Sequence, residues 1–388
     1  MKRTILILAM ILTSYISASA ETSQHKTYFA YDVNYEMRFD NREFYKSRFS
    51  KSMTIFGSRL TPSAGIQIVQ RDRTTHKIMT GIDIMKDFGA SPVAPSVTVP
   101  ESPELSSSLN NKDLFKELTL WYGMKKADRQ QSFELYAGIF PRRFMEGRYS
   151  QAFFSDSLAF YDNNLEGMLI RYKKRGTYFE LGCDWMGKYG DSRREKFMIF
   201  SSGEKKMGSM MYLGYSAYMY HFACSREVVG VVDNMLINPY LRFDFSRPFE
   251  VDNFTITVGW LQSFQHDRLN VGHYVFPNGA EVVTDLSNWN FGLKNHLFYG
   301  TDMMPYYNSK DIGGYKYGSR LYVGDPFFRV FDDGTTGYGI YDRLEVYYTP
   351  RLGKLLDLKV SALFHFNKGY SGCQQVVSLL FNLQEIVK

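Results

Sequence analysis

The sequence predicts an all-β fold, a transmembrane barrel of antiparallel strands, from three observations. The chain begins with an export segment, apolar and polar residues alternate with a period of two along most of its length, and aromatic residues make up 16% of it. A period of two places every second side chain on the same face of a strand. In a membrane barrel one face contacts lipid, the other lines the lumen, and aromatic residues gather at both interfaces.

Residues 1–20 have the layout of a secretory signal peptide. Lys2-Arg3 gives a positive start, an apolar stretch runs from Ile5 to Leu12, and residues 18–20 form a small-residue cleavage site. The apolar stretch is too short to cross a bilayer. We therefore expect residues 1–20 to be cleaved after export, and residues 21–388 to form a single barrel in the outer membrane of a Gram-negative cell.

Alternating segments then recur along the chain. In the first of them Phe29, Tyr31 and Val33 share one face, whereas Asp32 and Asn34 share the other. The pattern predicts about sixteen strands, with fourteen as the alternative. The predicted strands are 27–40, 60–73, 75–88, 113–126, 131–141, 164–175, 177–188, 193–203, 208–225, 233–246, 252–267, 287–300, 314–323, 338–349, 355–367 and 373–385.

The connections between these segments alternate in length. Short turns join the even-numbered strands to the next, which is typical of the periplasmic end of a barrel, and long loops belong to the external end. The segment 301–313 breaks this rule, since it is long where a short turn is expected. The loops 89–112, rich in Ser and Pro, and 142–163 are expected to stay outside or to fold into the lumen. The long loops are predicted at 41–59, 89–112, 142–163, 268–286 and 324–337.

Charged residues of both signs lie on the polar faces, so we expect a mixed-charge lumen. Arg242 with Asp244, and Arg343 with Glu345, stand two residues apart on one face and are expected to brace the wall. The predicted basic residues of the lumen are Arg38, Arg171, Lys173, Arg242, Lys294, Arg343 and Lys359. The predicted acidic residues are Asp32, Glu36, Glu117, Glu134, Glu180, Asp184, Asp244, Glu345 and Asp357.

The third long loop carries the candidate pore constriction. Its charged residues are Arg142, Arg143, Glu146, Arg148 and Asp156. Basic residues at a narrow point of a pore favour anions, because a guanidinium stays charged and binds phosphate or carboxylate. The alternative is that these arginines face solvent or the phosphates of lipopolysaccharide.

No recognisable catalytic motif, metal-ligand spacing or cofactor-binding motif occurs in the sequence. The three cysteines are widely spaced and predict no disulfide framework. His266-Asp267, beside Arg268, is the best candidate for an acid/base pair, although adjacent residues seldom converge on one atom. We expect a protein that is not an enzyme, with catalysis by residues distant in the sequence left open.

The mature chain resembles outer-membrane porins. Stretches such as DPFFRVF (325–331) and YDRLEVYYTPRLGK (341–354) look like barrels from Bacteroides-type bacteria, and residues 138–141 are faintly similar to phosphate-selective porins. The resemblance implies a channel for weakly selective diffusion of small hydrophilic, including anionic, solutes. The alternatives are a non-conducting barrel for adhesion or export assembly, and an outer-membrane hydrolase acting on lipid A or glycan.

The expected partners follow from this resemblance. They are the lipid bilayer with its lipopolysaccharide, small solutes and the barrel assembly machinery, which reads an apolar C-terminal strand such as the one around Phe381. No nucleic acid is expected, and association into a homo-oligomer is left open.

Overall fold

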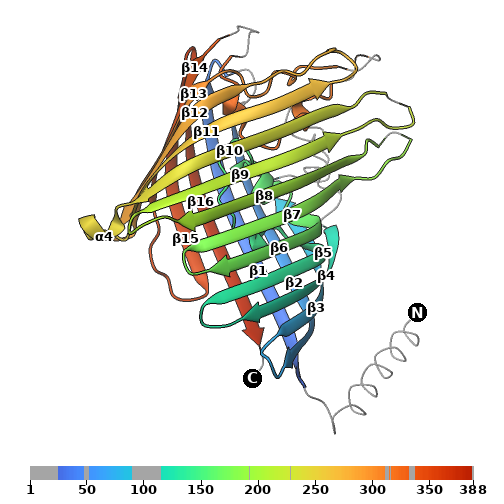
Figure 1. The fold of residues 1–388 in the computed structure, drawn as a ribbon, viewed down its shortest axis with the longest axis vertical. Helices are drawn as coiled ribbons and strands as arrows, with labels where there is room; N and C mark the ends of the chain where they lie inside the picture. Colours follow the sequence, from blue (N-terminus) through green and yellow to red (C-terminus); the bar gives the residue numbers. More distant parts are fainter. Residues whose placement is uncertain are drawn as a thin grey trace.

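The computed structural model describes residues 25–47, 52–89, 115–191, 193–227, 229–310, 314, 316–331 and 337–386. The predicted signal peptide and residues 90–112 lie outside these ranges. Within them, sixteen antiparallel strands form one closed barrel, so the predicted fold class is confirmed and the fourteen-stranded alternative is wrong. Figure 1 shows the tilted strands, with the first (blue) beside the last (red) where the barrel closes.

The strands are connected in sequence order around the wall. Their bounds are β1 His25–Tyr45, β2 Met53–Gln70, β3 Thr75–Asp87, β4 Phe115–Ala127, β5 Gln131–Pro141, β6 Asn164–Lys174, β7 Thr177–Gly187, β8 Lys196–Lys206, β9 Met211–Phe222, β10 Val232–Asp244, β11 Asn253–Asp267, β12 Asn278–Asn288, β13 Phe291–Gly300, β14 Gly339–Tyr348, β15 Leu356–Asn367 and β16 Tyr370–Ile386. Short helices interrupt the connections, namely η1 Arg142–Phe144, α3 Asp156–Tyr161, α4 Ser246–Phe249, η2 Gly318–Leu321 and η3 Pro326–Phe328.

The predicted strand pattern is wrong in one region. Residues 287–300 were expected to be one strand, but they contain the end of β12, the turn Trp289-Asn290 and β13. Residues 314–323, expected to be a strand, contain the helix η2 instead. The connection between the end of β13 at Gly300 and the start of β14 at Gly339 is consequently a single long one, which removes the exception at 301–313.

The physical reason for this error is an unusual turn. Trp289 and Asn290 both have positive φ, at 52° and 70°, as a two-residue hairpin turn with both central residues in the left-handed region requires. Asn and Gly are the usual residues in such turns, and a tryptophan there conceals the hairpin in the sequence. With β12 assigned, the external connections 142–163 and 301–338 are long, as predicted. The predicted loops 41–59 and 268–286 are too long, because β1 and β2 pair as far as residues 42 and 53 and residues 278–286 belong to β12, which leaves the connections 46–52 and 268–277. The predicted loop 89–112 lies outside the described residues apart from Gly89.

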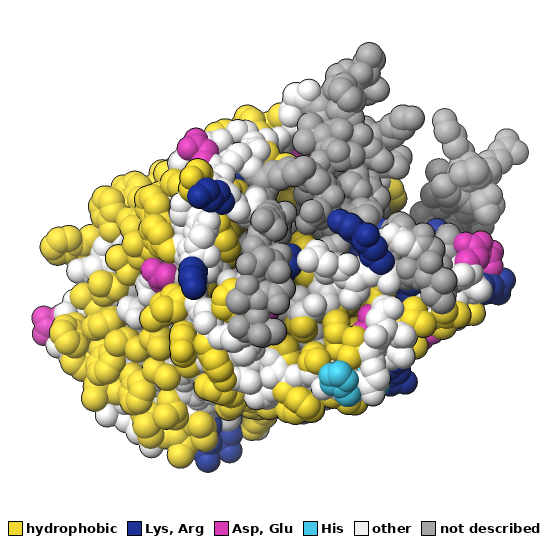
Figure 2. Space-filling model, turned by 90° about the horizontal axis from the view of Figure 1, so that it is seen from above, with side chains coloured by type: hydrophobic (Ala, Val, Ile, Leu, Met, Phe, Trp, Pro, Cys, Tyr) yellow, Lys and Arg dark blue, Asp and Glu magenta, His cyan; other side chains and the backbone are white. Residues whose placement is uncertain are grey.

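The outer face of the wall is apolar. Large apolar side chains such as Ile78, Leu120, Leu213 and Val258 are exposed there, whereas their strand neighbours point into the lumen. Figure 2 shows a broad apolar surface with few charged side chains. So much exposed apolar surface suits contact with lipid rather than with water. Among the described residues, no helix is long and apolar enough to cross a membrane.

Aromatic side chains gather near both ends of this apolar face. Near the external end, Phe56 packs edge-on against Phe88 with ring centroids 4.6 Å apart. Near the periplasmic end, Phe291 packs against Tyr348 at 4.7 Å. These groups form the two aromatic girdles expected of a membrane barrel.

Candidate functional site in the barrel lumen

The loop 142–163 runs through the inside of the barrel. It leaves from β5 and returns to β6, yet Arg143 is ion-paired with Asp32 on β1. Phe153 packs against Tyr218 on β9 at 5.3 Å, and Asp156 binds Arg343 on β14 at 2.8 Å. A loop that contacts β1, β9 and β14 crosses the lumen.

Arg142 holds the base of this loop. Its guanidinium is buried and lies 2.9 Å from the Asp162 carboxylate and 3.0 Å from that of Asp184 on β7. It also donates to the backbone carbonyls of Asp162 and Asn164, at 2.8 and 3.1 Å. Buried arginine is tolerated only with such full pairing. Arg142 is therefore an anchor of the loop.

A second carboxylate fixes the middle of the loop. Glu180 on β7 accepts the backbone N–H groups of Glu146 and Gly147 at 2.8 and 3.0 Å, and the Tyr149 hydroxyl at 3.1 Å. Gly147 is needed at this close approach, because a Cβ there would lie 2.6 Å from the Glu180 carboxylate. The chain after Gly147 is thereby held against the β7 wall.

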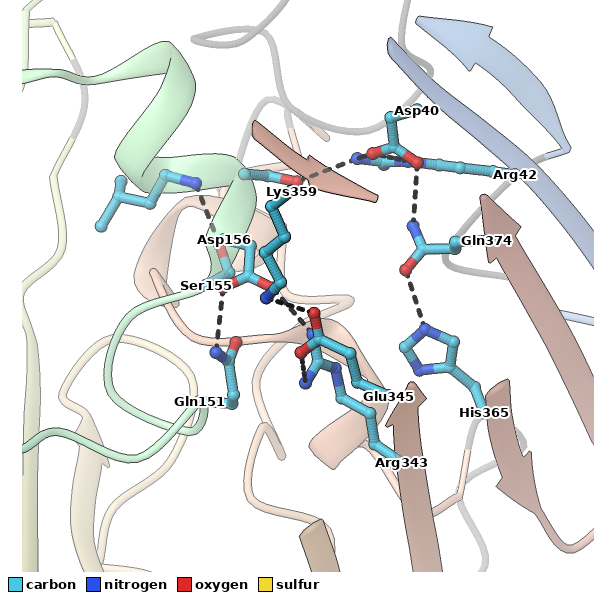
Figure 3. Close-up of polar contacts among 12 residues, drawn as sticks. Asp40, Arg42, Gln151, Ser155, Asp156, Arg343, Glu345, Lys359, His365 and Gln374 are labelled. Carbon is cyan, nitrogen blue, oxygen red and sulfur yellow. Dashed lines mark hydrogen bonds and ion pairs between the residues drawn. The ribbon is translucent and has the colours of Figure 1, made fainter. Parts of the chain in front are cut away.

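At the other end of the loop, Ser155 caps the helix α3, whose first residue is Asp156. Its hydroxyl accepts the backbone N–H of Leu158 at 3.2 Å. Partial desolvation opposes the ionisation of Asp156, but Arg343 and Arg38 outweigh it and hold the pKa of this half-exposed carboxyl below its usual range. Figure 3 shows Asp156 directed toward Arg343, beside the ion pair of Glu345 and Lys359. The far end of the loop is thus fixed to the opposite wall by charge.

A second segment, described over residues 301–310, 314 and 316–331, also enters the lumen. Asn234 on β10 donates to the carbonyl of Leu321 at 2.9 Å, and Tyr220 on β9 donates to that of Arg320 at 3.2 Å. Phe328 is fully buried and packs against Phe298 and Tyr341. This segment accounts for the residues that the sequence pattern assigned to a strand.

The two inserted segments bind each other. The backbone N–H of Ser155 donates to Val323 at 2.9 Å, and that of Asp325 donates to Gln151 at 2.8 Å. At their crossing, Gly324 approaches Ala152 so closely that a Cβ would lie 2.1 Å from the Ala152 carbonyl oxygen. We call this pair of segments the lumen insert.

The five candidate constriction residues have different environments. The side chain of Arg142 is only 8% exposed and that of Arg143 25%. Glu146, Arg148 and Asp156 are about half exposed, at 47%, 55% and 49%. The structure brings all five into the lumen, but only these last three reach open space.

Two cavities lie on the periplasmic side of the lumen insert. One, of about 650 Å³, is lined by Glu146 and Arg148 of the loop together with Lys173, Glu204 and residues of two periplasmic turns. The other, of about 660 Å³, is lined by Glu36, Asp357 and Lys359 and by further turn residues. Both cavities carry charges of both signs.

The predicted lumen charges are largely used in ion pairs. Arg242 lies 3.9 Å from Asp244 and Arg343 lies 3.6 Å from Glu345, but each has a shorter contact elsewhere. Those partners are Glu204 at 2.6 Å and Asp156 at 2.8 Å. The buried members are Asp32, Glu134, Arg171, Glu180, Asp184, Arg242, Arg343 and Glu345, and the partly or fully exposed ones are Glu36, Arg38, Glu117, Lys173, Asp244, Lys294, Asp357 and Lys359.

Sequence reasoning missed a polar network at the external end of β1. His365 shares a hydrogen bond of 2.8 Å with Gln374, which donates to Asp40 at 3.4 Å (Figure 3). Arg42 donates to Asp40 at 2.7 Å and to the Ser157 hydroxyl at 3.1 Å. The sequence pattern predicted which face of its strand each of these residues occupies. It could not predict which strands are neighbours in the barrel, and hence which side chains are in contact.

The candidate acid/base pair is separated by the wall. Asp267 is buried and accepts the backbone N–H groups of Leu269 and Asn270. His266, the next residue, points to the outer face, where its Nε2 lies 3.0 Å from the Val271 carbonyl. The two side chains cannot act on one substrate atom. In the part of the chain that the structure describes, no group of three or more His, Cys, Asp or Glu is arranged to hold a metal ion.

A family model described as lipid A 3′-O-deacylase-type matches residues 21–321 of the chain. This match overturns the expectation that the chain is not an enzyme, because the family is named for an enzyme activity. It also differs from the phosphate-selective porins suggested by residues 138–141. A search of curated proteins finds no match.

Several solved structures are similar in fold. A loop L8 deletion mutant of OmpT, an outer membrane protein of Vibrio cholerae, has a TM-score of 0.51 at 9% identity and covers 93% of this chain and 100% of that one. OccAB3 of Acinetobacter baumannii has a TM-score of 0.46 at 9% identity, covering 92% and 99%. OprD of Pseudomonas aeruginosa has 0.45 at 10% identity, covering 94% and 99%. At this identity the likeness concerns the barrel fold alone.

Proposed function

The chain belongs to the lipid A 3′-O-deacylase-type family, and on this premise we propose that it hydrolyses an acyl ester of a lipid A-type glycolipid in the outer membrane. The observation that carries the proposal is the length of the family match, which runs from before β1 to η2. The apolar outer wall and the aromatic girdles support a location in that membrane.

Because the lumen insert fills the external part of the lumen, we propose that such a substrate binds on the outer face of the barrel. A glycolipid with several acyl chains stays in the membrane, and the lumen behind the external end is occupied by residues 142–163, 301–310 and 316–331. Its ester groups meet this protein on the outer face of the wall, near the external girdle. Hydrolysis there needs only water as the second reactant.

The test is release of fatty acid by the purified, folded barrel. Mixed micelles containing lipid A with ester-linked acyl chains should yield free fatty acid, measured by mass spectrometry. Lipid A whose ester-linked chains have been removed by mild alkali serves as the matched control and should yield none. Absence of release from intact lipid A would contradict the proposal.

A second candidate is a constricted channel for small hydrophilic solutes, and a specific observation favours it. Arg148 and Glu146 lie on a loop that crosses the lumen, are half exposed, and line a cavity of about 650 Å³. Charged groups at a narrow point set the ion preference of a pore through a focused field. Because positive and negative side chains both line this cavity, we propose that the channel is only weakly selective between anions and cations.

Planar-bilayer recordings test this candidate. The wild-type protein should give ohmic conductance steps, and Arg148→Ala should move the reversal potential in a salt gradient toward cation preference. Arg226→Ala, which removes an exposed arginine from an external loop, should leave it unchanged. A non-conducting wild-type protein would exclude the channel and leave a closed barrel.

A further inference from the structure

The outer face of β9, β10 and β11 carries titratable side chains at its external end. His221 on β9 is directly opposite Asp233 on β10. The neighbours of both along their strands are buried in the lumen, so these two side chains point outward. They stand in the last paired rows before the external loops.

The polar pair lies directly above an apolar row. Two residues further toward the membrane lies a row of apolar side chains that face one another across β8 to β11. They are Ile199, Met219, Met235 and Phe264. Two residues span about 7 Å along a strand. In a lipid, the ester groups lie at this kind of boundary, between a polar headgroup and its hydrocarbon chains.

The contacts of Asp233 give it a positioning role. Arg268 binds its carboxylate with two nitrogens, Nε at 2.8 Å and Nη2 at 2.7 Å, and the Arg268 backbone N–H is held by Val231 at 2.9 Å. The other carboxylate oxygen lies 3.7 Å from Nδ1 of His221. This distance is too long for a hydrogen bond but lies within ion-pair range, so the carboxylate stabilises the imidazole by charge when it gains a proton at Nε2.

The pair is partly accessible from the outer face of the wall. The side chain of His221 is 28% exposed and that of Arg268 54%. The His221 ring rests on Phe197, with ring centroids 5.0 Å apart, and Phe197 stacks on Trp185 at 5.5 Å. These aromatic rings provide a surface for the sugar or the proximal part of an acyl chain.

We propose that His221, stabilised in its protonated form by Asp233 and assisted by Arg268, is the general base in the hydrolysis of an acyl ester of a membrane glycolipid on the outer wall. The assignment rests on the proposed hydrolase function and names its site.

The reaction balances with water alone. Nε2 of His221 takes a proton from water, and the hydroxide oxygen bonds to the acyl carbonyl carbon. The oxyanion is stabilised by Arg268, since a guanidinium has five N–H donors and the contact with Asp233 uses those on Nε and Nη2. The carbon–oxygen bond to the sugar then breaks, and His221 returns its proton to the sugar oxygen, which leaves a fatty acid and a hydroxyl group.

The experiment measures fatty-acid release from lipid A in mixed micelles by wild type and three variants. His221→Gln should lower the rate by about 100-fold or more, the usual contribution of a general base. Asp233→Asn should lower it less. His273→Gln is the control, and its rate should equal that of wild type, because His273 is an exposed residue of the loop between β11 and β12.

A fourth variant separates catalysis from folding. His221→Ala should regain part of its activity when imidazole is added to the buffer, which a purely structural role of His221 does not predict. If wild type is active and His221→Gln retains its rate, or imidazole fails to rescue His221→Ala, the site assignment is overturned while the hydrolase function stands. If wild type releases no fatty acid, the hydrolase function itself fails, and the site with it.

Discussion

Arg142 and Arg148 belong to the same loop but have opposite roles in the structure. Arg142 is buried between Asp162 and Asp184, whereas Arg148 is half exposed above a cavity. Both are arginines of the same loop, six positions apart, so the sequence offered no reason to predict that one is buried and the other exposed. The difference arises because Arg142 stands where the loop leaves β5, next to the β7 wall.

Replacing Arg142 by Ala should loosen the whole loop. It leaves the Asp184 carboxylate buried without its partner, and breaking one member of a buried pair costs about 3–5 kcal/mol. Native-state hydrogen exchange of the amides of Gly147 and Ala159 should report an opening free energy lower by that amount. Arg148→Ala is the control and should change it by less than about 1 kcal/mol.

Asp302 makes the packing of the second inserted segment depend on pH. Burial raises the pKa of Asp302 to about 6, although the Met304 backbone N–H and Arg329 oppose the increase. A carboxyl with a raised pKa in the folded state binds its proton more tightly there than in the open state. The packing is therefore strongest in acid and weakens as the pH rises from about 4 to about 6.

Hydrogen exchange of residues 301–310, corrected for the intrinsic effect of pH, should show this loss of protection. Asp302→Asn keeps an acceptor for the Met304 amide and removes the charge. In this variant the protection of residues 301–310 should no longer change between about pH 4 and about pH 6. An unchanged pH dependence in that variant would exclude Asp302 as the cause.

At the scale of elements, the two inserted segments stabilise each other through the close approach of Gly324 to Ala152. A Cβ at residue 324 would meet the Ala152 backbone at 2.1 Å, and backbone atoms cannot move aside cheaply. Gly324→Ala should therefore separate the segments, and cleavage by chymotrypsin after Phe153 or Phe327 in the folded barrel should become faster.

Gly190→Ala is the matched control for this experiment. Gly190 lies in the connection between β7 and β8, where an added Cβ would make an ordinary contact of 3.5 Å. Its cleavage should match that of wild type. Equal cleavage of both variants would show that the crossing at Gly324 does not hold the segments together.

At the scale of the whole molecule, the pairing of β1 with β16 closes the barrel. Glu43 is directly opposite Cys373 in this register. Opposed residues of antiparallel strands have Cα atoms about 4.5–5.5 Å apart, within the range of a disulfide. Glu43→Cys should therefore form a disulfide with Cys373 under mild oxidation.

The cross-link is detected as faster migration of the unfolded chain on a non-reducing gel, reversed by reductant. Asn41→Cys, which is opposite Gln375, should not react with Cys373. A disulfide from Asn41→Cys and none from Glu43→Cys would place the closing register two residues away from the one described.

The barrel class and the orientation of the strand faces followed from the sequence, because alternation with a period of two is a local property of each strand. The predicted number of strands equals the observed sixteen because one missed strand, β12, was offset by one predicted at 314–323, where the structure has η2. The hairpin of β12 and β13 was missed where Trp289 occupies a turn position that rarely takes a tryptophan. The same error hid the inserted segment 301–331.

The sequence by itself determined the barrel, its lipid-facing surface and the loop that carries the charged residues. Only the tertiary structure decided which of these charges are buried and which line a cavity, because Arg142, Asp156 and Arg343 meet partners on strands far away in the chain. It also placed His266 and Asp267 on opposite sides of the wall and brought His221 next to Asp233. Such pairings depend on strand register around a closed barrel, which no local pattern of residues records.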